Sequence, residues 1–124
     1  MIIDDNADAA TLLAMFIGFH GHDTAVAHSG AEGLALASTF APEVVLLDLG
    51  MPEMSGYDVA IALRKLPGLA CTYIAALTGW NDAQTRARVV ASGFDKHLVK
   101  PPDVGVVLDL MDTCGRSHAR SRCA

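Results

Sequence analysis

VVLLDLGMPEMSG, residues 44–56, is the stretch that decides the fold of this chain. Its first four residues are aliphatic, which is typical of a strand buried on both faces of a parallel sheet. Asp48 follows directly, and a parallel strand that ends in a carboxylate directs it to the edge where such sheets bind ligands. Gly50, Pro52 and Gly56 then predict a sharp turn with room beside the acid. We therefore interpret Asp48 as a residue that takes part in chemistry or ligand binding rather than one that only forms a turn.

Short apolar runs alternate with segments of helical period along the chain. Strands are predicted over residues 1–3, 24–27, 44–48, 73–77 and 96–99. Helices are predicted over 8–19, 29–40, 55–66, 82–92 and 103–111, with Asn81 or Asp82 as the cap of the fourth. This strict alternation predicts an α/β fold. The sheet is expected to be doubly wound, parallel and five-stranded, in the flavodoxin-like order 2-1-3-4-5, with helices on both faces.

The length of the chain limits the number of domains that it can form, and its charge limits the partners that it can bind. The 124 residues predict one domain over residues 1–111, followed by a flexible C-terminal tail over 112–124. The chain has 14 acidic and 9 basic residues, and its only basic cluster is Arg116, Arg120 and Arg122 in that tail. A nucleic-acid binder usually has a basic patch on its folded part, so we expect no nucleic-acid binding by this domain.

The cysteines and the N-terminal segment indicate the compartment. Cys71, Cys114 and Cys123 are odd in number and far apart, which disfavours a zinc site and a disulfide framework. The start of the chain has no basic region followed by a long apolar one, and no uncharged stretch is long enough for a membrane helix. We expect a cytoplasmic protein without membrane contact.

Polar side chains stand at the ends of four predicted strands. Asp4 and Asp5 follow the first, Asp48 ends the third, Thr78 follows the fourth and Lys100 follows the fifth. In a doubly wound sheet these carboxyl ends line one crevice. Three carboxylates together need positive charge to stay ionised. Lys100 supplies one charge, and Mg²⁺, which prefers oxygen ligands and keeps some of its waters, is the natural second.

This set of groups suits phosphoryl transfer to a carboxylate. Asp48 is the candidate nucleophile. Mg²⁺ and Lys100 would neutralise charge on the phosphoryl oxygens, and the Thr78 hydroxyl would donate a hydrogen bond to them.

The four motifs together resemble the receiver domain of two-component phosphorelay signalling, the phosphoacceptor domain of response regulators and of hybrid histidine kinases. The resemblance covers about residues 2–111. It rests on Asp4-Asp5, on the segment DLGMPEMSG at 48–56, on Thr78-Gly79 and on Lys100-Pro101. Each motif alone is weak, but all four in order and at strand ends are specific.

The resemblance implies a function and a site. A histidine kinase or a phosphotransfer domain would pass a phosphoryl group from its phosphohistidine to Asp48. Asp5 would bind Mg²⁺ directly, Asp4 mainly through water, and the Gly50 backbone carbonyl would complete the protein ligands. Thr78 would move toward the phosphoryl group and Lys100 would pair with it. The bond between Lys100 and Pro101 would be cis.

Two positions depart from the family's pattern. Only Met1, Ile2 and Ile3 precede the acidic pair, whereas the family usually has a longer first strand. The residue three before the lysine is usually Tyr or Phe and acts as the switch, but here it is His97. We keep His97 with Thr78 as the expected switch residues.

Other functions and contexts stay open at this point. One alternative is a small aspartyl-phosphate phosphotransferase or hydrolase, although such enzymes usually need a second acid where this chain has Gly50. A second is a degenerate receiver used only for docking, although none of its expected site residues is lost. The output domain or downstream protein is not readable from the sequence. A stand-alone receiver and a module of a hybrid kinase both fit.

Overall fold

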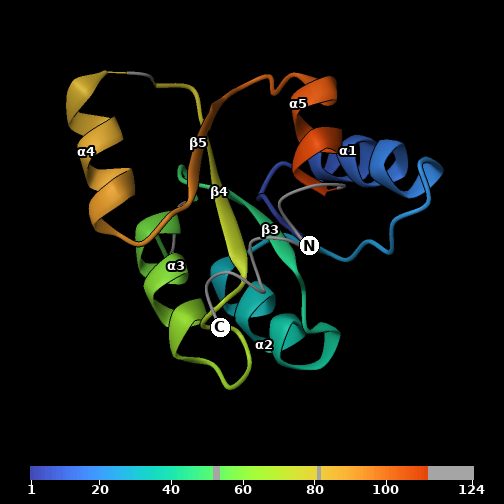
Figure 1. The fold of residues 1–124 in the computed structure, drawn as a ribbon, viewed down its shortest axis with the longest axis horizontal. Helices are drawn as coiled ribbons and strands as arrows, with labels where there is room; N and C mark the ends of the chain where they lie inside the picture. The colour runs from blue at the N-terminus through green and yellow to red at the C-terminus, as the bar shows by residue number, and fades with distance from the viewer. Residues whose placement is uncertain (52–53, 81, 112–124) are drawn as a thin grey trace.

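The computed structural model describes residues 1–51, 54–80 and 82–111. Within these ranges the strands are β1 (Ile2–Ile3), β2 (Val26–Ala27), β3 (Val44–Asp48), β4 (Tyr73–Thr78) and β5 (Lys96–Val99). All neighbours pair in parallel, in the order β2-β1-β3-β4-β5 (Figure 1). This confirms the predicted sheet, and it places the reversal of strand order between β1 and β3.

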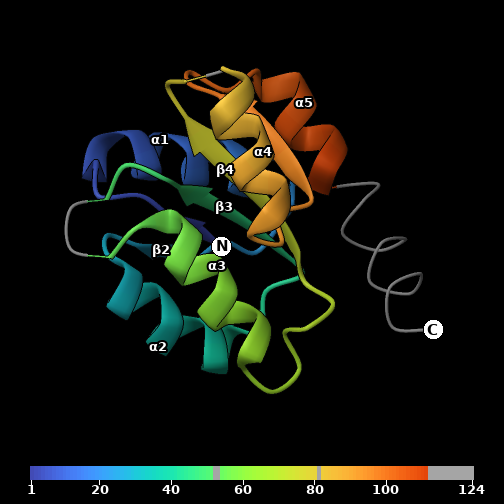
Figure 2. The same cartoon turned by 90° about the vertical axis from the view of Figure 1, so that its left-hand side faces the viewer.

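Helices cover both faces of this sheet (Figure 1 and Figure 2). They are α1 (Ala7–Phe19), α2 (Gly30–Phe40), α3 (Gly56–Lys65), α4 (Ala83–Ala91) and α5 (Val104–Asp109). Val45 and Leu47 of β3 pack with α2, α3 and α4, while Val44 and Leu46 pack with α1 and α5. Successive residues of a strand face opposite sides, so the first four residues of β3 are all apolar because both of its faces are covered.

Side-chain caps fix where the helices begin. The side chains of Ser29, Ser55, Asp82 and Asp103 each accept a hydrogen bond from a backbone N–H in the first turn of the helix that follows. These bonds satisfy N–H groups that have no partner within the helix. Asn6 caps α1 in the same way, which the sequence analysis did not anticipate.

Several predicted bounds are wrong by one or two residues, because terminal residues of an element are held by few hydrogen bonds. The strands predicted over 1–3 and 24–27 have two residues each, and residues 110–111, predicted as the end of the last helix, continue α5 as a π-helical turn. The predicted tail over 112–124 and the alternative cap Asn81 lie outside the described residues. None of the helices in the described ranges is long and apolar enough to span a membrane.

One cysteine corrects the expectation from sequence spacing. Cys71 is disulfide-bonded. The spacing of the cysteines along the chain disfavoured a disulfide framework.

A partly buried ion pair ties α3 to the residues just before β4 and β5. Arg64 Nη2 donates to Asp95 Oδ2 at 2.8 Å and to the Gly93 carbonyl at 2.8 Å, and Nη1 donates to the Thr72 carbonyl. Asp95 Oδ2 also accepts the backbone N–H of Ile74 at 2.9 Å. The Arg64 and Asp95 side chains are 16% and 6% exposed. This pair therefore joins three elements that are far apart in sequence.

Replacing Asp95 by Ala is expected to lower the free energy of unfolding by about 2 kcal/mol or more, because the Arg64 charge and the Ile74 N–H both lose their acceptor. Urea denaturation measures this change. The matched variant Asp95→Asn keeps an acceptor for Ile74 and should cost less. An Ala variant as stable as the wild type would show that the pair contributes nothing.

The N-terminal amine lies inside the fold. It donates to the carbonyl of Val44, the first residue of β3, at 2.8 Å. Burial away from water lowers the pKa of this amine from 8.0 to about 5. The amine is therefore neutral in the folded protein at pH 7.

Candidate functional site

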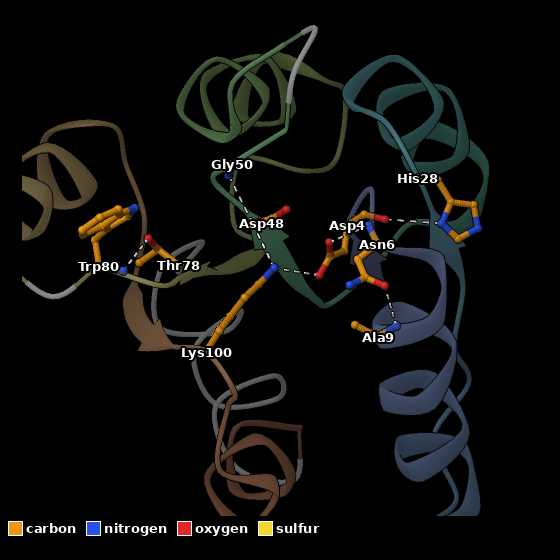
Figure 3. A network of polar contacts seen from close by, with 9 residues as sticks. All are labelled: Asp4, Asn6, Ala9, His28, Asp48, Gly50, Thr78, Trp80 and Lys100. Carbon is orange, nitrogen blue, oxygen red and sulfur yellow. Dashed lines mark hydrogen bonds and ion pairs between the residues drawn. The ribbon is translucent and has the colours of Figure 1, made fainter.

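The carboxyl ends of the strands bring the predicted site residues to one edge of the sheet (Figure 3). Asp4 follows β1, Asp48 ends β3 and Lys100 follows β5. The side chains of Asp4 and Asp48 are only 4% and 8% exposed. Burying two carboxylates side by side is costly unless a cation and hydrogen bonds compensate.

Lys100 provides that compensation. Its Nζ lies 3.0 Å from Asp4 Oδ2 and 3.1 Å from Asp48 Oδ1, so one ammonium joins the ends of β1 and β3. Burial lowers the pKa of Lys100, but hydrogen bonds and charge interactions with Asp4 and Asp48 outweigh it and raise the pKa above 10.5. The charge is therefore present throughout neutral pH. Its contribution to stability is lost only as pH rises through this raised value.

A third carboxylate completes an acidic cluster. Asp5 is exposed, and one carboxylate oxygen from each of Asp4, Asp5 and Asp48 lies within 4.8 Å of the others. Hard oxygen ligands from two buried acids and one exposed acid suit a divalent cation that keeps some of its waters. One ammonium balances only one of the three negative charges. Both the donor set and the charge therefore fit Mg²⁺.

The loop after β3 is shaped by two glycines. The Gly50 N–H donates to Asp48 Oδ1 at 3.2 Å and helps to orient the carboxylate. A Cβ at Gly56 would lie 2.6 Å from the Asp48 carbonyl oxygen, so only glycine lets α3 begin directly against the end of β3. At Gly50 the nearest atom to such a Cβ is 3.7 Å away, and the backbone there lies open beside the acid.

Thr78 ends β4, the strand next to Asp48 in the sheet. It is buried, and its Oγ1 accepts the backbone N–H of Trp80 at 3.1 Å (Figure 3). The Trp80 side chain is 72% exposed. The Thr78 hydroxyl thus lies at the edge of the site, and its hydrogen bond also fixes the backbone at the start of the loop before α4.

His97 lies on β5 and contacts the same loop. Its ring is half-buried, and Nε2 lies 3.1 Å from the Trp80 carbonyl oxygen. A carbonyl only accepts, so the imidazole carries its proton on Nε2 and donates. The two expected switch residues therefore both bond to backbone groups of Trp80, Thr78 to its N–H and His97 to its carbonyl.

Two further residues, which were not predicted from the sequence, support Asp4. The backbone N–H of Asn6 donates to Asp4 Oδ1 at 3.0 Å, and His28 Nδ1 lies 3.3 Å from the Asp4 carbonyl (Figure 3). A small polar residue directly before a helical pattern is a cap signal, so Asn6 was detectable. His28 comes from the end of β2 and is placed there only by the fold. The expected cis bond between Lys100 and Pro101 is confirmed.

Comparison with known proteins gives a family match. The family model described as the response regulator receiver domain matches residues 1–112. Among solved structures, the chemotaxis protein CheY4 of Vibrio cholerae superimposes with a TM-score of 0.84 at 25% identity, over 90% of this chain and 92% of that one. The match thus covers nearly the whole of both chains.

Two curated relatives are longer proteins. The DNA-binding response regulator MtrA of Mycolicibacterium paratuberculosis is 35% identical over 101 residues, which cover 82% of this chain and 44% of MtrA. The DNA-binding dual master transcriptional regulator RpaA of Synechocystis is 32% identical over 108 residues, which cover 87% of this chain and 45% of RpaA. This chain therefore matches less than half the length of either protein.

Proposed function

Because the chain belongs to the family of response regulator receiver domains, we propose that Asp48 accepts a phosphoryl group from the phosphohistidine of a histidine kinase or phosphotransfer domain. In this step an Asp48 carboxylate oxygen attacks phosphorus, the P–O bond forms and the P–N bond to the donor histidine breaks. The imidazole nitrogen of the donor keeps the electron pair of that bond.

The observation that carries this proposal is the position of Lys100. Its ammonium lies at 3.0 and 3.1 Å from carboxylates that end two neighbouring strands. A cation held there, beside two buried carboxylates, is placed to stabilise charge that develops on phosphoryl oxygens at Asp48. The buried Thr78 hydroxyl, at the end of the adjacent strand, is the proposed hydrogen-bond donor to the same oxygens.

Mg²⁺ supplies the remaining positive charge when it is bound. Asp5, Asp48 and the Gly50 carbonyl are the proposed direct ligands, and Asp4 is proposed to act mainly through water. This division is supported by the hydrogen bonds of Asp4, because both of its oxygens already accept one, Oδ1 from the Asn6 N–H and Oδ2 from Lys100. Asp5 is exposed and offers a carboxylate oxygen to a solvated ion.

The proposed output is a change of surface. A phosphoryl group adds charge beside Thr78, and Thr78 and His97 are the residues proposed to transmit the change to α4, β5 and α5. As a receiver domain, the chain is a signalling domain rather than a turnover enzyme. Slow loss of its own phosphoryl group, and recognition of this surface by an output domain or a downstream protein, are parts of the proposal. Residues 1–111 are proposed to act as the receiver unit.

Mg²⁺ with beryllofluoride, a phosphoryl mimic, tests the proposal. The chain has one tryptophan, Trp80, whose backbone N–H is bonded to Thr78. Beryllofluoride in Mg²⁺ buffer is expected to change Trp80 fluorescence and the amide shifts near Thr78. No response with Mg²⁺ present would refute the proposed function. Repeated turnover of a small phosphate ester would favour an enzyme instead.

Asp5→Asn is expected to weaken Mg²⁺ binding by about tenfold or more, because a charged direct ligand is lost; altering groups outside the coordination shell already costs at least that much. Calorimetric titration with Mg²⁺ measures the change. The matched control is Asp8→Asn, which removes the same charge from an exposed position in the first turn of α1. Equal weakening in both variants would mean that only net charge matters and that Asp5 is not a ligand.

A further inference from the structure

A groove between α1 and the start of α5 opens beside the site. Its apolar walls are Leu12, Leu13 and Phe16 of α1, and Pro101, Pro102 and Val104 of the segment that starts α5. Leu12 is 68% exposed and Val104 is 47% exposed, so the groove is open to solvent. Its volume of about 530 Å³ is within the range of small-molecule sites, which are also mostly apolar with a few polar groups.

The polar groups of the groove include one donor with a proton to spare. Of the described residues that line the groove, only Asp4 and Lys100 are charged, and their side chains point toward each other and meet at 3.0 Å (Figure 3). An ammonium has three protons to donate. Asp4 and Asp48 take two of those of Lys100, which leaves one for a further acceptor. Lys100 is 32% exposed, so a molecule in the groove can reach it.

The charges at this end of the groove select an uncharged head group. Asp4, Asp5 and Asp48 gather three carboxylates beside one ammonium, so an anionic head would be repelled by the acidic cluster. A cationic head would lie against the Lys100 ammonium itself. A neutral acceptor, such as a carbonyl oxygen, can take the remaining Lys100 proton without either penalty.

We propose that this groove binds an uncharged small molecule that has an apolar body and a hydrogen-bond acceptor at one end. The body lies between α1 and Val104, and the acceptor takes the remaining proton of Lys100. The bound molecule also competes for Lys100 with a phosphoryl group on Asp48. This second part rests on the proposed function, whereas the binding itself does not.

N,N-dimethylbenzamide is a suitable probe, because it has a phenyl ring, a carbonyl acceptor and no charge. In the protein without Mg²⁺, it is expected to shift the methyl NMR resonances of Leu12, Leu13 and Val104 in a saturable way. The resonances of Val59 and Leu63, which pack on the other face of the sheet, should not move. Shifts of equal size on both faces, or shifts that do not saturate, would overturn the proposal.

Three further probes test the head group. Toluene has no acceptor, benzoate carries a negative charge, and benzylamine is positively charged at neutral pH. Each is expected to bind more weakly than the amide, and toluene by about tenfold, because a hydrogen bond to a charged group is lost. Toluene that binds as well as the amide would refute the role of Lys100. Tighter binding of either charged probe would refute the uncharged class of ligand.

Two variants test the location. Ala9 is an exposed residue of α1 that lines the groove, so Ala9→Phe places a ring where the ring of the probe would lie. The affinity for the amide is expected to fall about tenfold or more, because the probe can no longer bury its ring. Val104→Phe fills the groove from α5 and gives the same loss if Ala9→Phe does not fold. Ala35→Phe, at an exposed alanine of α2, is the matched control and should bind like the wild type.

Competition for Lys100 is measured with beryllofluoride in Mg²⁺ buffer, through the amide shift of Thr78. At a probe concentration of about twice its Kd, the apparent affinity for beryllofluoride should fall about threefold, because the two ligands exclude each other. In Ala9→Phe the same probe concentration should have little effect. An unchanged affinity in the wild type would overturn the competition.

The outcomes separate this inference from the proposed function. If beryllofluoride gives no response in the wild type, the proposed function fails, and the titration without Mg²⁺ still decides whether the groove binds the probe. If beryllofluoride acts but the groove variants bind the amide like the wild type, the proposed function stands and the groove site fails. A sedimentation coefficient that rises with protein concentration in the wild type, but not in Ala9→Phe, would show that a second copy of the chain fills the groove and would overturn the small-molecule site.

Discussion

Asp48→Asn is expected to reduce phosphoryl labelling of this protein to background. An amide nitrogen or oxygen is a far poorer nucleophile than a carboxylate, so removal of the attacking group should remove the reaction rather than slow it slightly. Incubation with a labelled phosphohistidine donor in Mg²⁺ buffer, followed by electrophoresis, measures the loss. The same variant should give no fluorescence response to beryllofluoride.

The structure makes this substitution a clean test. An Asn side chain keeps an oxygen in the position that accepts the Gly50 N–H, and it removes one of two neighbouring buried negative charges. We therefore expect the variant to fold with little change in stability. Asp8→Asn, an exposed change of equal charge, should be labelled like the wild type. Label retained in Asp48→Asn would place the acceptor on another residue.

The buried amine of Met1 is expected to make stability depend strongly on pH. Its pKa is lowered from 8.0 to about 5 by burial, so between these values the unfolded chain binds a proton that the folded chain does not. Stability therefore rises with pH across this window, by about 1.4 kcal/mol per pH unit at most. The total from pH 5 to pH 8 is about 4 kcal/mol for this group.

Urea denaturation at intervals of pH measures that dependence. Protein acetylated at the N-terminus is the control, because it has no titrating amine while its histidines and carboxylates are unchanged. The difference between the two pH profiles isolates Met1. Parallel profiles would show that the amine is solvated in the folded state and that its pKa is ordinary.

The fold was predictable because its determinants are local. The aliphatic run before Asp48 is buried on both faces, and the capping residues Ser29 and Ser55 start their helices as predicted. The shortest strands were predicted least accurately. β1 and β2 have two residues each, and pairing with neighbours rather than local pattern decides their ends.

The site was predictable for a different reason. In a parallel sheet the carboxyl ends of all strands lie on one edge. Once the strand order was assumed, the sequence therefore predicted that Asp4, Asp48 and Lys100 lie close together. Contacts that depend on the direction of individual side chains could not be predicted from the sequence. The sequence contains no sign that Arg64 meets Asp95, 31 residues away, or that His28 approaches the Asp4 carbonyl. The hydrogen bond from His97 to the Trp80 carbonyl was equally unpredictable, because it depends on how β5 and the loop before α4 approach each other.

The cluster around Lys100 also sets how the site responds to salt. Three carboxylates and one ammonium leave a formal charge of 3 − 1 = 2 negative units at one edge of a chain whose net charge is already −5. A divalent ion brings that local sum to zero. The attraction that draws the ion in from solution is screened over about 8 Å at physiological ionic strength. Monovalent salt should therefore slow capture of the ion, while the loaded site, whose charges are balanced, should respond to salt much less.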